Sequence, residues 1–265
     1  MPPDLSSANW KIDRAVELLS GLDTEVAAWH DKKPYSIFTY VNPEKTRATV
    51  NVREHHPPDK IRWSLMVADI VHNLRCALDH TFWAILQDEF PSGLPPKTDR
   101  LSFPIWSAPP NADQRRNFQP LSPKFLAAIE SVQPYSRPDN RFPVHPLAII
   151  RDIDNGNKHK LLFTVMPSLA KVDVKVSGLR HPHQPGVHEI MYRGELKDGV
   201  EAVVTTFDVP EPYMKYECTM CMSIIAIKHP VANRLGQDRD DYAALIDTLI
   251  VEVREVIAAL AASVA

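Results

Sequence analysis

Helical and strand-like hydrophobic patterns occupy separate blocks of this chain, and that separation constrains its fold more than any other feature of the sequence. Two strand-like runs at residues 35–53 are expected to form a hairpin, and further strand-like runs lie within residues 161–227. Apolar residues recur at helical spacing in residues 7–30, 59–87, 123–131, 146–155 and 238–262. Such blocks predict an α+β fold, with a helical layer and a long central helix packed on a mainly antiparallel sheet.

A single interleaved domain spanning residues 1–265 is the simplest organisation of these blocks. The hairpin at residues 35–53 is too small to be stable alone, so we expect it to join the later strands in one sheet. Residues 89–145 are rich in proline and mostly lack periodicity. Their apolar anchors, among them Phe103 and Trp106, predict a layer that packs onto the core.

Composition and charge narrow the expected binding partners and the expected cellular compartment. The net charge of −3 and the pI of about 6.4 argue against broad electrostatic capture of nucleic acid or of anionic membranes, and leave room for a local basic pocket. No apolar run reaches the length of about 18 to 20 residues that a membrane span requires. The three cysteines, few and odd in number, favour a reducing compartment. We therefore expect a cytoplasmic protein with no membrane partner.

The long helix expected at residues 59–87 carries an unusual polar face. At about 100° per residue, one side of this helix is apolar, and the opposite side carries Asp69, His72, Cys76, Asp79, His80 and Trp83. This polar face has no Lys or Glu, whereas Cys and Trp are costly to expose. We interpret the face as covered, with its polar groups in a cleft. A buried, hydrogen-bonded network and a plain surface are the alternatives.

Spacing on this helix predicts specific pairs. Arg75 and Asp79 lie four residues apart, close enough for an ion pair that holds the guanidinium in a fixed pose. Asp69 lies one turn from Asn73, and Asp79 is the candidate carboxylate for His72. A carboxylate beside an imidazole fixes its tautomer, as a general acid or base requires.

A second polar segment spans residues 151–160. It resembles a calcium loop only superficially, because a loop that begins at Asp152 has Asn157 at the glycine position and Phe163 at the glutamate position. We reject calcium binding of that type. The pair Lys158 and His159 remains, at an expected helix-to-strand junction where functional side chains are often displayed. A simple surface turn is an equally good interpretation.

Four short segments resemble motifs of a set of uncharacterised bacterial, especially actinobacterial, proteins. HNLRCALDHTFW at residues 72–83 contains a Leu-Arg-x-Ala-Leu-Asp-His motif, and NKHK at residues 157–160 contains a later Lys-His motif. FPI at residues 103–105 and QPY at residues 133–135 lie between them. The resemblance covers about residues 60–165 and implies no known activity.

Arg75 and His80 also form an Arg-x4-His pattern, similar to the signature of HEPN domains. HEPN domains are helical folds that include metal-independent endoribonucleases. Cys76 departs from this family, in which the residue after the arginine is often polar, and the strand-like runs after residue 160 exceed the usual helical bundle. The resemblance implies RNA cleavage that uses Arg75 and His80.

The leading hypothesis is therefore a metal-independent endoribonuclease-like hydrolase without a cofactor, with RNA as its partner. His80 and His159 would divide the proton transfers, and Arg75 and Lys158 would neutralise the phosphate. Asp79 would orient Arg75 or a histidine. The supporting residues would be His72, Asn73, Asp69 and Asn157.

Two other classes stay open. A metal-dependent hydrolase or lyase would bind a divalent metal through His72, His80 and His159, although His72 and His80 lie two turns apart on the helix. A non-catalytic module would bind a small molecule or a protein and use the Arg-Asp-His network to hold its fold. The apolar stripe of residues 238–262 would serve a homodimer as well as the core.

The remaining motifs exclude common chemistries. Cys218 and Cys221 form a single CxxC, which is half of a structural zinc site. The run around them is strand-like, so the two thiols should point to opposite faces, with one in the core. The sequence has no glycine-rich phosphate loop, dinucleotide fingerprint, GxSxG or HExxH.

Overall fold

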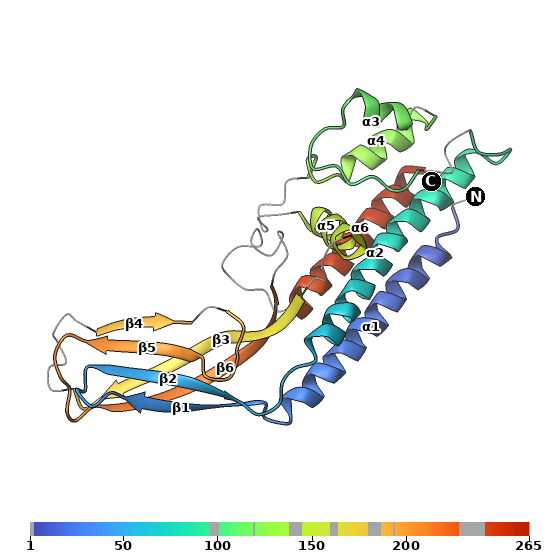
Figure 1. The fold of residues 1–265 in the computed structure, drawn as a ribbon. Helices are drawn as coiled ribbons and strands as arrows, with labels where there is room; N and C mark the ends of the chain where they lie inside the picture. Colours follow the sequence, from blue (N-terminus) through green and yellow to red (C-terminus); the bar gives the residue numbers. More distant parts are fainter. Residues whose placement is uncertain are drawn as a thin grey trace. The chain divides into compact units, whose positions relative to one another are not determined.

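A computed structural model of the chain describes residues 3–95, 101–118, 120–137, 145–159, 164–179, 187–192, 194–227 and 242–264 (Figure 1). The helices in these ranges are α1 (Ser6–His30), α2 (Lys60–Glu89), α3 (Ala112–Asn117), α4 (Pro123–Ser131), α5 (Pro146–His159) and α6 (Tyr242–Val264). The strands are β1 (Tyr35–Val41), β2 (Arg47–Glu54), β3 (Thr164–Ser177), β4 (Val187–Met191), β5 (Glu201–Phe207) and β6 (Lys215–Ile227). The predicted α+β class and the long helix at its centre are confirmed.

The chain divides into two compact units, each assembled from segments that are distant in the sequence. Unit 1 comprises Met1–Asp23, Ile61–Thr164 and Ala226–Ala265, and unit 2 comprises Thr24–Lys60 and Val165–Ile225. Unit 1 is helical, whereas unit 2 contains most of the strands. The organisation as a single interleaved domain over residues 1–265 stays a prediction.

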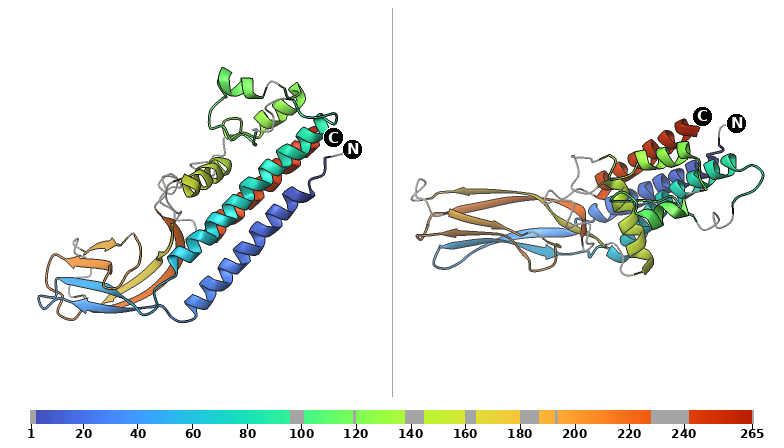
Figure 2. Two further views of the ribbon diagram at one scale, coloured as in Figure 1. Left: turned by 45° about the vertical axis from the view of Figure 1, so that its right-hand side comes forward. Right: turned by 90° about the horizontal axis from the view of Figure 1, so that it is seen from above.

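Unit 1 is built on long helices whose apolar stripes are buried. The helices α1, α2 and α6 run side by side (Figures 1 and 2), and α6 also contacts α4 and α5. The predicted apolar face of α2 is buried throughout, at Val67, Ile70, Leu74, Leu78, Thr81 and Ile85. The predicted stripe of α6 is buried as well, at Leu245, Leu249, Val253, Ile257 and Leu260. Burial of these stripes is the main stabilising contribution in the helical core.

Two details of the helices differ from the sequence prediction. The six residues of α3 fall in the stretch expected to lack structure, because so short a helix shows no periodicity. Its start is fixed instead by a capping box, in which the side chains of Asn111 and Gln114 bind each other's backbone N–H groups. The helix α5 extends to His159, one turn beyond its predicted end.

The strands form two antiparallel sheets, so the prediction of a single sheet was wrong. The hairpin does join a later strand as expected, because β2 pairs with β5 at Val50 and Val203, giving the order β1-β2-β5-β4. The strands β3 and β6 pair with each other instead. They span 14 and 13 residues, so each can satisfy the other's backbone groups over most of its length.

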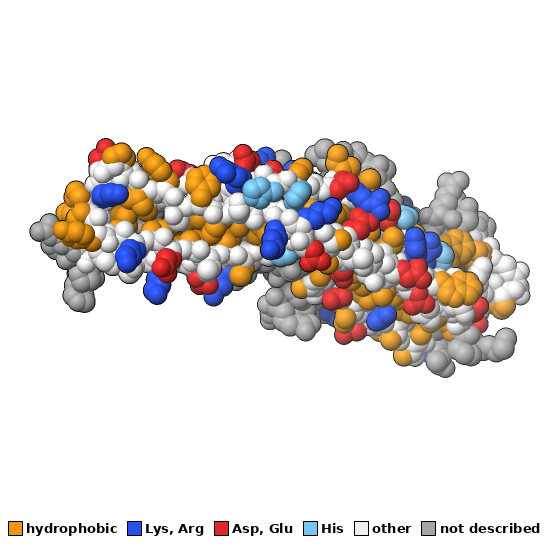
Figure 3. Space-filling view, turned by 90° about the horizontal axis from the view of Figure 1, so that it is seen from below, with side chains coloured by type: hydrophobic (Ala, Val, Ile, Leu, Met, Phe, Trp, Pro, Cys, Tyr) orange, Lys and Arg blue, Asp and Glu red, His pale blue; other side chains and the backbone are white. Residues whose placement is uncertain are grey.

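The surface of the helices is mixed in charge. On the face shown in Figure 3, acidic and basic side chains are interspersed over the helices. This distribution agrees with the small net charge of −3. No helix within the described ranges is long and apolar enough to cross a membrane.

A cluster of polar contacts in unit 2 ties the segment before β5 to residues far away in the sequence. The Tyr35 hydroxyl donates to Glu54 Oε1 at 3.0 Å and to the Leu196 carbonyl at 3.3 Å, and burial raises the pKa of Tyr35 well above its ordinary value. Glu195 accepts from Lys60 and, at 3.1 Å, from Lys197. Burial raises the pKa of Glu195, but the two ammonium groups outweigh this effect and hold that pKa below its ordinary value.

Replacing Glu195→Gln should therefore lower the free energy of unfolding near neutral pH by about 1 kcal/mol. Because the folded pKa of Glu195 is depressed, its contribution is present above the unfolded carboxyl pKa of about 4.3 and is lost as the pH falls through the folded value. Urea unfolding of both proteins as a function of pH measures the difference. The control is Glu201→Gln, which removes the more exposed Arg47–Glu201 pair and should have little effect. A difference that persists unchanged below the folded pKa would contradict this account.

Candidate functional site

The polar face of α2 is partly exposed rather than fully covered. Asp69 is exposed and the His72 side chain is 50% exposed, whereas Cys76, His80 and Trp83 are half-buried. The interpretation of a fully covered face was therefore wrong. The reason lies in packing, since the buried residues of α2 already form a stripe broad enough for its neighbours in the helical core.

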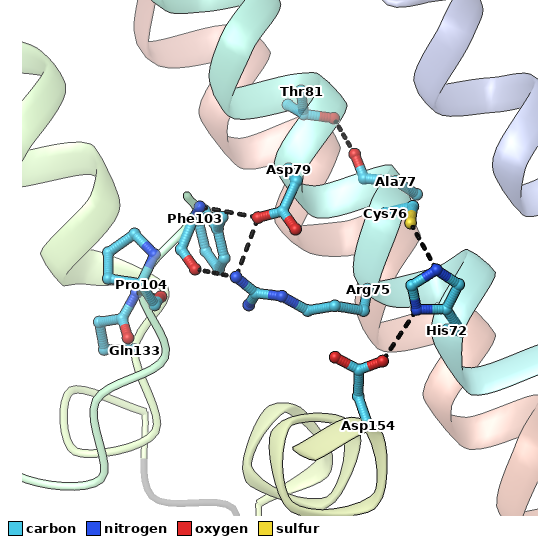
Figure 4. Close-up of polar contacts among 10 residues, drawn as sticks. All are labelled: His72, Arg75, Cys76, Ala77, Asp79, Thr81, Phe103, Pro104, Gln133 and Asp154. Carbon is cyan, nitrogen blue, oxygen red and sulfur yellow. Dashed lines mark hydrogen bonds and ion pairs between the residues drawn. The ribbon is translucent and has the colours of Figure 1, made fainter. Parts of the chain in front are cut away.

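Arg75 and Asp79 form the predicted ion pair, and together they bind the backbone of Phe103 (Figure 4). Arg75 Nη2 lies 2.9 Å from Asp79 Oδ1 and donates to the Phe103 carbonyl at 2.6 Å. Asp79 Oδ1 also accepts from the Phe103 N–H at 2.9 Å. The two side chains are 14% and 27% exposed. Both partners of the pair are thus committed to holding a segment of the chain.

Two further side chains bind the residues that follow Phe103. Gln133, fully buried, accepts from the Trp106 N–H at 2.7 Å and donates to the Pro104 carbonyl at 3.1 Å. Arg151 Nη1 on α5 donates to the Ile105 carbonyl at 3.3 Å. The side chains of Arg75, Asp79, Gln133 and Arg151 form what we term the backbone clamp.

The backbone clamp has a clear physical purpose. Residues 103–106 are buried but have no regular secondary structure, so their N–H and C=O groups lack the partners that a helix or a sheet supplies. An unsatisfied buried group costs about 1–3 kcal/mol, and the four side chains of the backbone clamp avoid that cost.

Three of the four segments that carry the bacterial resemblance, residues 72–83, 103–105 and 133–135, meet in the backbone clamp.

A second group of side chains connects α2 to α5 (Figure 4). His72 Nδ1 lies 2.9 Å from Asp154 Oδ1, and Cys76 Sγ lies 3.5 Å from His72 Nε2. Asp154 is 5% exposed at its side chain, while His72 is 50% exposed. The imidazole thus lies in space between a thiol and a buried carboxylate, and it is open to solvent.

The carboxylate determines which nitrogen of His72 carries the proton. An ionised carboxylate only accepts hydrogen bonds, so Nδ1 must be the donor in the contact with Asp154. In the neutral ring, Nε2 is then the acceptor and faces the thiol of Cys76. This is the arrangement that a general base requires.

The partner of His72 was predicted wrongly. Asp79 lies seven residues from His72, which is about 10 Å along a helix axis, and its carboxylate is occupied by Arg75 and Phe103. Asp154 was not a candidate. Its signal in the sequence is that it follows Leu147 and Ile150 at helical spacing, which places a carboxylate on a buried stripe where it needs a partner.

The remaining predicted site residues lie on α2 and α5. Asn73 Nδ2 donates to the Asp69 carbonyl at 2.8 Å, a contact within one turn of α2. The His80 imidazole forms no hydrogen bond or ion pair with the rest of the described chain. Asn157, Lys158 and His159 lie in the last turn of α5, and their side chains are outside those that the structure describes. Their meeting with His80 stays a prediction.

Neither the candidate metal ligands nor the cysteine pair is part of a metal site among the described side chains. Among the described side chains, no three of His, Cys, Asp or Glu are grouped to hold a metal ion; His159 is not among them. His72 and His80 are eight residues apart on α2, about 12 Å along its axis. Cys218 is half-buried and Cys221 exposed on β6, so they occupy opposite faces as predicted, but neither lies in the core.

Comparison of the chain with protein-family models, with curated proteins and with solved structures finds no match.

The backbone clamp should make unit 1 sensitive to loss of either charge. Arg75→Ala and Asp79→Ala should each lower the free energy of unfolding by about 2–4 kcal/mol, because each leaves a polar group of Phe103 and a partner charge unsatisfied. The loss in the free energy of unfolding should be smaller for the double variant than the sum of the two single losses. The second change removes a group that the first has already left without its partner. Urea unfolding monitored by circular dichroism measures the cycle. Arg14→Ala, which removes an exposed pair with Glu17, is the control and should cost less than about 0.5 kcal/mol.

Proposed function

We propose that this chain is a metal-independent hydrolase in which His72, oriented by Asp154, is the group that transfers protons. The observation that carries the proposal is the contact of 2.9 Å between His72 Nδ1 and a carboxylate that is 5% exposed. The buried carboxylate fixes the tautomer and stabilises the imidazolium that forms when Nε2 takes up a proton.

The exposure of the two residues supports a role in chemistry. Asp154 is shielded from water, whereas half of the His72 side chain is open to an approaching substrate. Such a pair can accept a proton from a nucleophile and return it to a leaving group, so a hydrolysis needs no metal for its proton transfers.

The contacts of Arg75 affect which class of substrate the site can bind. An endoribonuclease of the predicted kind would use this guanidinium to neutralise the phosphate, but here it binds Asp79 and the Phe103 carbonyl. RNA cleavage through His80 and the Arg-x4-His pattern stays a prediction. If it is correct, the hydrolysis rate in the experiment below should depend on His80 and not on His72.

The test measures hydrolysis in excess chelator by the purified protein. The substrates are total RNA, p-nitrophenyl acetate and bis(p-nitrophenyl) phosphate. We expect at least one to be hydrolysed, with His72→Gln lowering the rate about 100-fold or more. Asp154→Asn should lower the rate at least about tenfold, because an amide does not enforce the same tautomer.

His80→Gln is the matched control, an imidazole two turns away on the same helix. It should leave the rate unchanged, and circular dichroism should confirm that every variant is folded. The proposal fails if wild type hydrolyses none of the three substrates in chelator. It also fails if the rate depends on His80 and not on His72, which would return the endoribonuclease hypothesis to the lead.

A further inference from the structure

Cys76 lies one turn after His72 on α2, on the side of the imidazole away from Asp154 (Figure 4). Its sulfur is 3.5 Å from His72 Nε2, the nitrogen left unprotonated by the contact with the carboxylate. The thiol therefore donates to Nε2, and transfer of its proton would yield a thiolate beside an imidazolium.

The other two cysteines have different surroundings. Cys218 Sγ donates to the Thr219 carbonyl at 3.7 Å, and burial, together with the carboxylates of Glu189 and Asp173, raises the pKa of the Cys218 thiol. Cys221 is exposed on the opposite face of β6. Of the three thiols, Cys76 is the one placed against an oriented base.

We propose that Cys76 is the nucleophile of the hydrolase, and that its substrates are carboxylic esters or thioesters; this inference rests on the proposed function. The Cys76 proton passes to His72 Nε2 as the sulfur attacks the carbonyl carbon and the carbonyl π pair moves to oxygen. That pair then re-forms the C=O bond, and the leaving group departs with the proton from Nε2. The product of this half-reaction is an acyl thioester on Cys76.

Water completes the cycle. It attacks the thioester carbonyl while His72 Nε2 takes its proton, and the Cys76 sulfur leaves and is protonated again by Nε2. The net reaction consumes one ester and one water and yields one carboxylic acid and one alcohol or thiol. No oxidant, reductant or further reactant is needed.

Among the described side chains, two arginines close to the site residues in the chain favour an acyl substrate over a phosphoryl one, because both are already bound. Arg75, next to Cys76 in the chain, is 14% exposed and is bound to Asp79 and Phe103. Arg151, one turn before Asp154, is bound to Asp152, the Ile105 carbonyl and Ser107 Oγ. A phosphate needs such cations to offset its charge, whereas an ester is neutral.

Acetylation of the three cysteines tests the inference within one molecule. The wild-type protein is treated briefly with p-nitrophenyl acetate, and the label is located by peptide mass spectrometry. Cys76 should be acetylated at least about tenfold faster than Cys221, because the imidazole placed 3.5 Å from its sulfur can accept the proton as the sulfur attacks. Cys218 should be the slowest. Hydroxylamine should remove the label from Cys76, as expected for a thioester.

His72→Gln should slow acetylation of Cys76 about tenfold or more and leave that of Cys221 unchanged, whereas Cys76→Ser should abolish ester turnover. Equal labelling of Cys76 and Cys221 in wild type would overturn the inference. The inference would also be overturned if Cys76→Ala kept the hydrolysis in chelator that His72→Gln loses. That result would leave the proposed function intact. Hydrolysis that neither variant alters would overturn both this inference and the proposed function.

Discussion

The backbone of residues 103–106 is buried without secondary structure, and the side chains that satisfy it organise the helical unit. Arg75 and Asp79 come from α2, Gln133 follows α4, and Arg151 comes from α5. Because unsatisfied buried backbone groups are costly, these elements are fixed to a common segment. Aromatic contacts extend the same assembly, since Trp106 packs on Phe118 and Phe118 on Phe82 of α2.

The candidate site depends on this arrangement. Arg75 lies one turn after His72 on α2, and Arg151 lies one turn before Asp154 on α5. Both arginines bind residues 103–105, so the segment sets the separation of the two helices at the level where His72 and Asp154 meet. The same contacts occupy the guanidinium groups of Arg75 and Arg151.

Periodicity predicted most of the secondary structure because long amphipathic stripes must be buried. The stripes of α2 and α6 are buried as expected, and the hairpin of residues 35–53 joins β5. The short helix α3 and the division of the strands into two sheets were missed, because a capped helix of six residues has no periodic signal and strand pairing is a long-range choice.

The sequence by itself determined the Arg75–Asp79 pair, because residues four apart on a helix must be neighbours whatever surrounds them. It also determined which face of α2 enters the core, since that follows from the apolar spacing. Only the tertiary structure decided that this pair binds Phe103, and that His72 is oriented by Asp154, 82 residues away, rather than by Asp79. Contacts between distant segments depend on how helices pack against one another, and no local spacing in the chain encodes that geometry.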